Sequence, residues 1–409
     1  MSSELLTGNQ AAAWGARLAS VDYIPAYPIT PQTEIIEVLA RWIEAGRMPA
    51  RLVTMVSEHS MLTAAGAAAA TGVRVFTATS SQGLLYAFEM LYTVAGWRVP
   101  LVLVNVSRAV AAPITLEPDH NDVLAARDCG FLQIHAETCQ EALDSVLLAY
   151  RLAEHPQVML PVLVNLDGFS LSFTREPVEI PPPAAARAFL PAYQPGVLHF
   201  SASHPMAQGV AVLGGSAYSF FRYAMQRAAE RALAVHEEVA REFAERFGRT
   251  YGVVEEYALE DAEWVFVMSN SFATVGKAQV RRLRERGEKV GLLRLRVLRP
   301  FPQAAVRRAL AGRRGVAVFD QNLSIGKGGI GFTEIASVFD ARSRPLLLSF
   351  VGGLGGRRLR EEEFDMALGC LREAEAGKEF PLPILLYTPT EFEQMRTLLR
   401  IAGHWPEEG

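Results

Sequence analysis

VRVFTATSSQGLLYAFEMLYTVAGWRVPLVLVNVS, residues 73–107, places two apolar runs on either side of a helical stretch. The flanking runs, VRVFTAT and VPLVLVNVS, are apolar on both faces, which is typical of strands in a parallel sheet that is covered on each side. The stretch between them, SQGLLYAFEMLYTVAG, has the 3.6-residue apolar period of a helix and closes with glycine, a common helix C-cap. The segment therefore predicts a strand, a crossover helix and a second, parallel strand.

The same alternation extends to both sides of this segment. VDYIPAY and RLVTMVS before it, and VMLPVLVNL after it, have the composition of further buried strands. A second series of apolar runs begins near Asp261 with AEWVFVMSN and continues through KVGLLRLRVLRPFP, GVAVFDQNLS and PLLLSFVGG. We therefore predict an α/β fold in which a doubly wound parallel-sheet domain is followed by a smaller α/β domain.

The proline-rich stretch REPVEIPPPAAARAF, residues 175–189, breaks this alternation. Proline removes a backbone donor and stiffens the chain, so such stretches are common in linkers. A long amphipathic helix is expected after it, in YAMQRAAERALAVHEEVAREFAERFG. We expect residues 1–250 to form the first domain, with residues 175–250 as a linker and helical extension, and residues 251–409 to form the second.

Composition and charge exclude several classes of protein. The chain has 409 residues, more than one hydrophobic core usually holds, and a net charge of -4, which argues against a nucleic-acid partner. Its most apolar stretch, Met61–Val106, is interrupted by Arg74, Glu89 and Arg98, so we expect no contact with a membrane. The first residues lack the basic and apolar regions of an export signal, which predicts a cytoplasmic protein.

The three cysteines, Cys129, Cys139 and Cys370, are widely separated and form no CxxC pair. Structural zinc sites and iron–sulfur clusters need several closely placed cysteine or histidine ligands. We therefore predict that this chain has no metal site and that its cysteines are small buried side chains in a reducing compartment.

Three polar residues, Thr30, Glu58 and Arg108, directly follow predicted strands. Because ligands of open α/β sheets bind outside the carboxyl ends of the strands, we expect these side chains to face one crevice. Each has a purely structural alternative. Thr30 can cap the helix after it, Glu58 can favour a helix start through its charge, and Arg108 can form an interdomain ion pair.

Ten segments carry a resemblance to a known family. They are YPITPQTEIIEVLA, SEHS, FTATSSQGLLYAFEMLY, SRAVAAPITLEPDHND, RDCGF, LPVLVNLDGF, LEDAEWVFVMSN, GLLRLRVLRPFP, LSIGKGGIGFTE and VGGLGGR. In this order they closely resemble the alpha subunit of the pyruvate:ferredoxin oxidoreductase family, the 2-oxoacid:acceptor oxidoreductases. The resemblance implies a thiamine pyrimidine-binding domain followed by a domain like the C-terminal domain of transketolase.

The resemblance also implies roles for individual residues. Glu58 matches the glutamate that hydrogen-bonds N1′ of the thiamine aminopyrimidine, where a carboxyl lets the cofactor act as its own base. Arg108 matches the arginine that holds the substrate, and its planar guanidinium suits bidentate capture of a carboxylate. Thr30 matches a threonine that hydrogen-bonds the substrate. These three are the expected catalytic residues.

Further site residues follow from the same match. We expect the cofactor to be contacted, besides Glu58, by Pro28, Ile29, Ser81 and Gln82. We expect the substrate to be contacted, besides Thr30 and Arg108, by His120, for which a plain loop position is an equal alternative.

Half of the thiamine site is missing from the sequence. No GDG with a downstream asparagine is present, and the nearest look-alike, Asn165–Gly168, lacks the first glycine and that asparagine. The resemblance therefore implies that a beta subunit with a GDG motif shares the thiamine diphosphate and holds its diphosphate and Mg²⁺. It also implies a gamma subunit, a ferredoxin-like subunit with iron–sulfur clusters, coenzyme A as co-substrate, and ferredoxin or a flavoprotein as acceptor.

The loop after Arg108 departs from the pattern of the pyruvate enzymes. Where an asparagine-containing segment and DHSD are expected, this chain has APITLEP, residues 112–118, and then DHND, residues 119–122. The change leaves two kinds of substrate open: pyruvate, and a bulkier 2-oxoacid, including an aryl one such as phenylglyoxylate.

The function predicted is the CoA-dependent oxidative decarboxylation of a 2-oxoacid to acyl-CoA and CO₂, with electrons passed to iron–sulfur clusters. Two alternatives stay open at this point. One is the beta chain of a lipoyl-dependent 2-oxoacid dehydrogenase, which also supplies a pyrimidine-side glutamate. The other is a noncatalytic scaffold subunit with the same fold.

Overall fold

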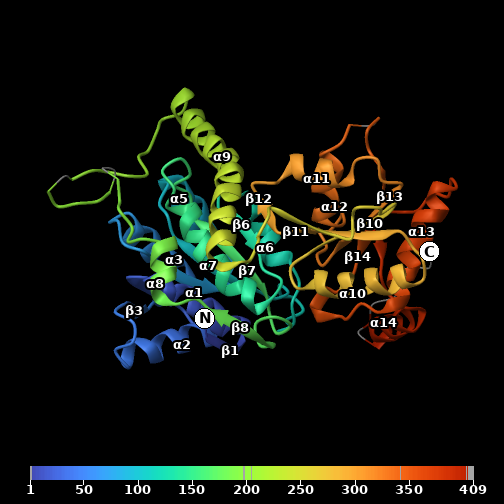
Figure 1. Ribbon diagram of the computed structural model, residues 1–409, viewed down its shortest axis with the longest axis horizontal. Helices are drawn as coiled ribbons and strands as arrows, with labels where there is room; N and C mark the ends of the chain where they lie inside the picture. The colour runs from blue at the N-terminus through green and yellow to red at the C-terminus, as the bar shows by residue number, and fades with distance from the viewer. Residues whose placement is uncertain (1, 197–198, 204, 341, 402, 404–409) are drawn as a thin grey trace.

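Four parallel strands from the N-terminal half of the chain form most of the first sheet (Figure 1). The structure is a computed structural model that describes residues 2–196, 199–203, 205–340, 342–401 and 403. Neighbouring strands run in the order β6, β7, β5 and β4. Their bounds are β4 Phe76–Thr79, β5 Val102–Ser107, β6 Leu132–His135 and β7 Val162–Asp167. A bridge between Tyr23 and Val75 continues this sheet to a parallel pair, β2 (Tyr23–Ala26) and β3 (Arg51–Thr54).

Helices cover both faces of this sheet, as the sequence predicts. Val102, Val104 and Val106 of β5 belong to one hydrophobic core, whereas Leu103, between them, belongs to another. The first core includes α1 (Gly8–Leu18) and α7 (Cys139–Ala153), and the second includes α3 (Glu58–Ala69) and α5 (Phe88–Trp97). Two covered faces are the mark of a doubly wound sheet. The remaining helices here are α2 (Thr33–Glu44), α4 (Ser81–Tyr86) and α6 (Asn121–Ala125).

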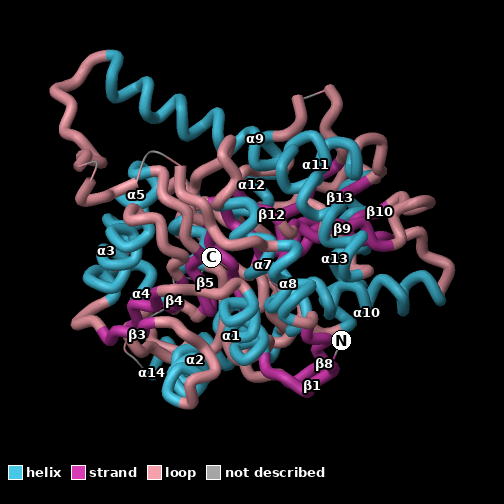
Figure 2. The backbone as a smooth tube through the Cα atoms, turned by 60° about the vertical axis from the view of Figure 1, so that its left-hand side comes forward, coloured by secondary structure: helices cyan, strands magenta, loops and turns pink. Residues whose placement is uncertain are grey.

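The proline-rich stretch contains regular structure as well as a connection. Its first residues form β8 (Arg175–Ile180), which pairs antiparallel with β1 (Ser2–Thr7) at the start of the chain. It continues as α8 (Pro183–Phe189), where proline suits the first helical position because no backbone donor is needed there. The long helix is α9 (Ser216–Phe247), and its first half projects from the body of the molecule (Figure 2).

The second sheet has six strands, in the order β15, β14, β13, β10, β11 and β9. Only β9 runs antiparallel to its neighbour. The strands are β9 Val254–Tyr257, β10 Trp264–Ser269, β11 Val290–Leu295, β13 Gly315–Asp320, β14 Leu346–Val351 and β15 Ile384–Leu385. The helices are α10 Phe272–Glu285, α11 Gln303–Leu310, α12 Ile330–Ser337, α13 Glu361–Glu375 and α14 Pro389–Ile401.

An edge strand of the first sheet and a buried ion cluster link the two sheets. β12 (Val297–Arg299), which follows β11, pairs antiparallel with β6 of the first sheet. Next to it, Arg294 and Arg296 both bond to Glu141 of α7. The division of the chain at residue 250 therefore stays a proposal, since residues beyond it complete the first sheet. Within the described ranges, no helix is long and apolar enough to cross a membrane.

Candidate active site

Thr30 lies in the loop that follows β2. The loop is fixed from both sides, because Gln32 donates through Nε2 to the Tyr27 carbonyl at 2.9 Å and Asn9 donates through Nδ2 to the Pro31 carbonyl at 2.9 Å. The Thr30 side chain is exposed, like that of Pro28. The loop thus presents Thr30 to the outside of the carboxyl edge of the sheet.

Glu58 is the first residue of α3, and it is buried with 6% of its surface exposed. Ser57 before it already caps the helix, since its hydroxyl accepts the backbone N–H of Ser60 at 3.1 Å. None of the residues that the structure describes hydrogen-bonds to the Glu58 carboxylate. The helix therefore does not need Glu58 as a cap, although a negative charge at this end is favourable.

Gly83, in the helix α4 that follows β4, packs closely against the Glu58 side chain. At Gly83, a Cβ atom would lie 2.6 Å from Oε1 of Glu58 and 2.6 Å from Oγ1 of Thr79. Any larger residue would displace one of these side chains. Ser81, two positions earlier, has a φ of 45°, a conformation that non-glycine residues adopt at a cost and that is often found at functional sites.

Arg108 directly follows β5 and is buried, yet it has no carboxylate partner in the described part of the chain. Its Nη1 donates to the Thr30 carbonyl at 2.7 Å, and its Nη2 donates to Oε1 of Gln82. Burial lowers the pKa of Arg108, and the charge of Asp122 opposes that shift only in part. The guanidinium thus joins two of the predicted site segments.

Four buried polar atoms in this region lack a hydrogen-bond partner among the described residues: Oγ1 of Thr79, Oγ of Ser80, Nε2 of Gln82 and Nε of Arg108. A buried polar group without a partner costs about 1–3 kcal/mol. Native proteins keep such groups rare, and a cluster of them at neighbouring strand ends indicates a ligand that supplies the partners. The arrangement offers a carboxylate and a guanidinium to that ligand.

His120 lies elsewhere. Its Nε2 is 2.8 Å from Oδ1 of the buried Asp167, and its backbone N–H donates to the Gln321 carbonyl at 2.8 Å. Burial would lower the pKa of His120, but the charge and hydrogen bond of Asp167 outweigh burial, so the pKa is raised. Asp167 in turn accepts from Nδ2 of Asn270 at 2.8 Å and from the Ser271 backbone.

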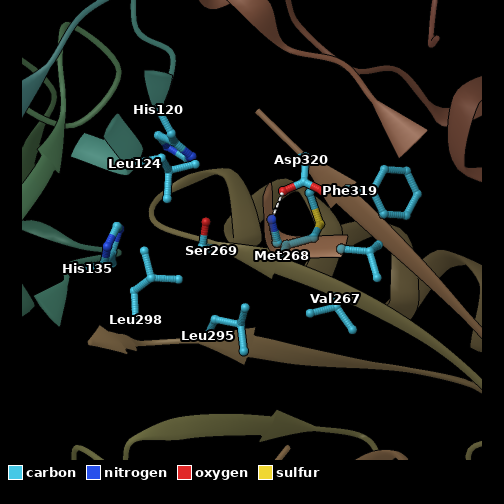
Figure 3. A pocket seen from close by; sticks show the side chains of 12 residues that line it. His120, Leu124, His135, Val267, Met268, Ser269, Leu295, Leu298, Phe319 and Asp320 are labelled. Carbon is cyan, nitrogen blue, oxygen red and sulfur yellow. Dashed lines mark hydrogen bonds between the residues drawn. The ribbon is translucent and has the colours of Figure 1, made fainter. Parts of the chain in front are cut away.

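The His120 ring lines a small internal cavity between the two sheets, of about 20 Å³. Figure 3 shows His120 and His135 on one side of this cavity and Asp320 on the other. A volume of this size holds about one water molecule and no 2-oxoacid. The structure places the His120 ring against Asp167, and the expected contact of His120 with the substrate stays a prediction.

The remaining predicted residues fall beside Arg108 or in the Thr30 loop. Ser81 donates through Oγ to the Ala109 carbonyl at 3.1 Å, and Gln82 binds Arg108 as described above. Ile29 is half-buried next to Pro28 in the loop after β2. Sequence reasoning missed Thr79, Ser80 and Gly83, although the polar run TATSS at the end of a buried strand is a signal for them.

Two protein-family models match this chain. Residues 14–241 match the family model described as pyruvate flavodoxin/ferredoxin oxidoreductase, thiamine diphosphate-binding. This chain belongs to that family. Residues 262–364 match a second model, pyruvate:ferredoxin oxidoreductase core domain II. The resemblance to an alpha subunit of a 2-oxoacid:ferredoxin oxidoreductase is thereby confirmed, and with it the assignment of this alpha subunit to an enzyme.

Relatives cover nearly the full length of this alpha subunit. The pyruvate synthase subunit PorA of Methanothermobacter thermautotrophicus is 44% identical over 87% of this chain and 91% of the relative. The PorA subunit of Methanocaldococcus jannaschii is 42% identical over 91% of this chain and 95% of its own. The ketoisovalerate oxidoreductase subunit VorA of Pyrococcus horikoshii is 41% identical over 87% of this chain and 90% of the relative. These names favour the ferredoxin-linked family over a lipoyl-dependent dehydrogenase.

Two solved structures share the fold. The 2-oxoglutarate:ferredoxin oxidoreductase from Magnetococcus marinus, solved with 2-oxoglutarate, coenzyme A and succinyl-CoA, aligns with a TM-score of 0.68 at 19% identity. The alignment covers 91% of this alpha subunit and 65% of that chain. A split gene transketolase, an inactive beta4 tetramer, aligns with a TM-score of 0.52 at 11% identity, over 91% of this chain and 99% of the other. The predicted fold class is confirmed.

Proposed function

We propose that this chain is the pyrimidine-binding alpha subunit of a thiamine diphosphate-dependent enzyme that converts a 2-oxoacid and coenzyme A to acyl-CoA and CO₂. The observation that carries the proposal is the cluster of unpaired buried polar atoms around Glu58 and Arg108. Within the described part of the chain, the carboxylate has no partner and the guanidinium has no counter-ion, and a thiamine cofactor and a 2-oxoacid would complete these two groups.

The residues near Glu58 fit an aminopyrimidine ring. Among the described residues the Glu58 carboxylate has no hydrogen-bond partner, Gly83 places no side chain against it, and Ser80 and Gln82 each contribute an unpaired polar atom. In this assignment Glu58 holds a proton at N1′ of the ring, while Ser81, Gln82, Pro28 and Ile29 line it. When bound, thiamine diphosphate supplies a carbon nucleophile that adds to the carbonyl group of the 2-oxoacid and accepts its electrons.

Arg108 and Thr30 are assigned to the substrate. The Nε atom of Arg108 is buried without a partner, and a carboxylate can bind along the edge formed by Nε and Nη2. Thr30 itself provides the carbonyl that orients the guanidinium, so its hydroxyl belongs to the residue that Arg108 contacts. Binding there holds the 2-oxoacid by its carboxylate before decarboxylation.

Pyruvate is the proposed substrate, because the relatives include pyruvate synthase subunits. A bulkier acid is the alternative, supported by the ketoisovalerate relative and by two exposed apolar residues, Ile114 and Leu116, in the loop after Arg108. Phenylglyoxylate is the aryl example of this second class.

Other chains are proposed to supply the rest of the reaction. The sequence has no GDG motif, which supports a beta subunit that binds the diphosphate and Mg²⁺. Iron–sulfur clusters are assigned to a ferredoxin-like subunit, with a gamma subunit completing the complex and ferredoxin or a flavoprotein as the acceptor. We place the complex in the cytoplasm.

The test is to purify the native complex, identify its chains by mass, and assay CoA-dependent viologen reduction with pyruvate, ketoisovalerate, 2-oxoglutarate and phenylglyoxylate. We expect bound thiamine diphosphate, a GDG-bearing chain, a cluster-bearing chain and the highest kcat/KM with pyruvate. Activity of this chain by itself, or a complex that turns over 2-oxoacids without thiamine, would contradict the proposal.

A further inference from the structure

Asp122 is a fully buried residue whose carboxylate accepts a hydrogen bond from the backbone of Arg108, the proposed substrate arginine. It accepts five hydrogen bonds. Its Oδ2 accepts from the backbone N–H of Ser81 at 3.0 Å, from Nδ2 of Asn105 at 3.1 Å and from the backbone N–H of Arg108 at 3.4 Å. Its Oδ1 accepts from Oγ of Ser107 at 2.9 Å and from the backbone N–H of Val123 at 2.7 Å.

We propose that Asp122 is a positioning residue for the 2-oxoacid, acting through Arg108. The inference rests on the proposed function, because it assumes that Arg108 binds the substrate. One carboxylate ties the backbone after β4, at Ser81, to the backbone after β5, at Arg108. The next residue after Ser81, Gln82, is the one that accepts from Arg108. Asp122 therefore sets the spacing between the guanidinium and the amide that orients it.

The backbone conformation at Ser81 supports this assignment. Its φ of 45° is unfavourable for a residue with a side chain, so the surrounding structure must hold it. The hydrogen bond from the Ser81 N–H to Asp122 is one restraint, and that from its hydroxyl to the Ala109 carbonyl is another. Both restraints lead to the segment that carries Arg108.

A role in core packing alone explains Asp122 poorly. A buried carboxylate is costly, and no ion pair within the described residues compensates it. Burial raises the pKa of Asp122, which the hydrogen bonds from Asn105, Val123 and Ser107 oppose. An apolar side chain would fill the same volume without this cost. The carboxylate is needed because N–H and O–H donors converge on it from two strand ends.

The short helix α6, which contains Asp122, is also held by the segment after β13 of the second sheet. Asn121 accepts the backbone N–H of Leu323 through Oδ1 at 3.2 Å, and His120 donates its backbone N–H to Gln321. Asp122 thus stands on a segment that the second sheet holds in place. Such support is what a positioning carboxylate requires, since a mobile one would not fix its donors.

The test is Asp122→Asn in the assembled complex. In the variant, an NH₂ group replaces one of the two carboxylate oxygens. Each oxygen accepts at least one backbone N–H, so the NH₂ group faces a donor in either orientation of the amide. We expect KM for the 2-oxoacid to rise about tenfold or more, with thiamine content unchanged. The control is Asp144→Asn, a second buried carboxylate, which bonds to Arg249 and Tyr251 away from the site. It should lower the melting temperature and leave KM unchanged.

A double-mutant cycle decides whether Asp122 acts through Arg108. In an Arg108→Ala background, Asp122→Asn should change KM no further, whereas additive effects would overturn the proposal. An unchanged KM in the folded single variant would overturn it as well. If Asp122→Asn does not assemble, Ser107→Ala, which removes one donor to Oδ1, should raise KM severalfold, and an unchanged KM there decides against the proposal. A normal KM in Arg108→Ala alone would instead refute the proposed substrate site.

Discussion

Two buried arginines, Arg108 and Arg296, each directly follow an interior strand, but among the described residues only Arg296 has a carboxylate partner. Arg296 follows β11, is 1% exposed, and bonds to Glu141 through Nε and to Ser145 at 3.0 Å through Nη2. Arg108 follows β5, is 6% exposed, and bonds to an amide oxygen and a backbone carbonyl. Its Nε has no hydrogen-bond partner in the ranges that the structure describes.

We propose that this difference separates a structural charge, Arg296, from a charge that binds a ligand, Arg108. A buried ion is costly unless it is paired and hydrogen-bonded, and Glu141 provides that pairing for Arg294 and Arg296. Burial would raise the pKa of Glu141, but the two arginines outweigh it and lower the pKa to about 2. At Arg108 no carboxylate of the described residues forms an ion pair with the guanidinium, which is why we propose a ligand carboxylate as its counter-ion.

Of the variants that test this comparison, Arg108→Ala is expected to have the largest effect, on the KM for the 2-oxoacid. Removing one partner of a buried, hydrogen-bonded charge pair costs about 2–5 kcal/mol, which corresponds to a rise in KM of roughly 30-fold to several thousand-fold. Thiamine content should stay the same, and Arg108→Lys should restore affinity only in part, because an ammonium lacks the planar pair of donors. Steady-state kinetics with the 2-oxoacid varied measures this, and a wild-type KM would move the substrate elsewhere.

Glu141→Gln tests the structural member of the pair. It leaves two arginines without their shared counter-ion, so we expect a stability loss of about 3 kcal/mol and no change in the KM of the folded complex. Because the folded-state pKa of Glu141 is depressed, its stabilisation is present above about pH 4.5 and is lost as the pH falls towards about 2. Melting temperatures of wild type and variant should therefore converge in acid; a constant difference would contradict this account.

The fold was largely predictable because buried parallel strands have a continuous apolar sequence. β5 and β7 are buried along their whole length, and both were expected. β6 was missed because its four residues include the polar Gln133 and His135. β1 was missed because it is an edge strand whose partner, β8, lies far along the chain.

The candidate site was predictable in part, for a topological reason. Parallel strands end at one edge, so Glu58 and Arg108 were expected to approach each other once their strands were recognised. The donors to Asp122 come from strand ends up to 41 residues away in the sequence, and no local pattern reveals such a convergence. The pairing of His120 with Asp167 crosses 47 residues and was missed for the same reason.

A smaller effect is expected from His120→Gln. This variant tests whether His120 has a structural role, like Arg296, or contacts the substrate, as proposed for Arg108. We expect a stability loss of about 1–3 kcal/mol, typical of a hydrogen bond to a charged group, and an unchanged KM. Because the folded-state pKa of His120 is raised, its stabilisation is full below about pH 6.5 and is lost as the pH rises through the folded-state value. The melting temperature of the variant should therefore differ more from wild type at pH 6 than at pH 9. A raised KM with normal melting would return His120 to the substrate site.

We propose that the Glu58 carboxylate, to which no described residue hydrogen-bonds, serves the cofactor and not the helix. Glu58→Gln keeps the shape and a hydrogen bond to N1′ but cannot share a proton with it, while Ser57 still caps α3. The most direct measurement is the exchange rate of the C2 proton of thiamine diphosphate bound to the assembled Glu58→Gln complex, alongside its melting temperature. We predict exchange slowed by about 10²–10⁴ with thiamine bound and the melting temperature nearly unchanged. Wild-type exchange with thiamine bound would contradict the account.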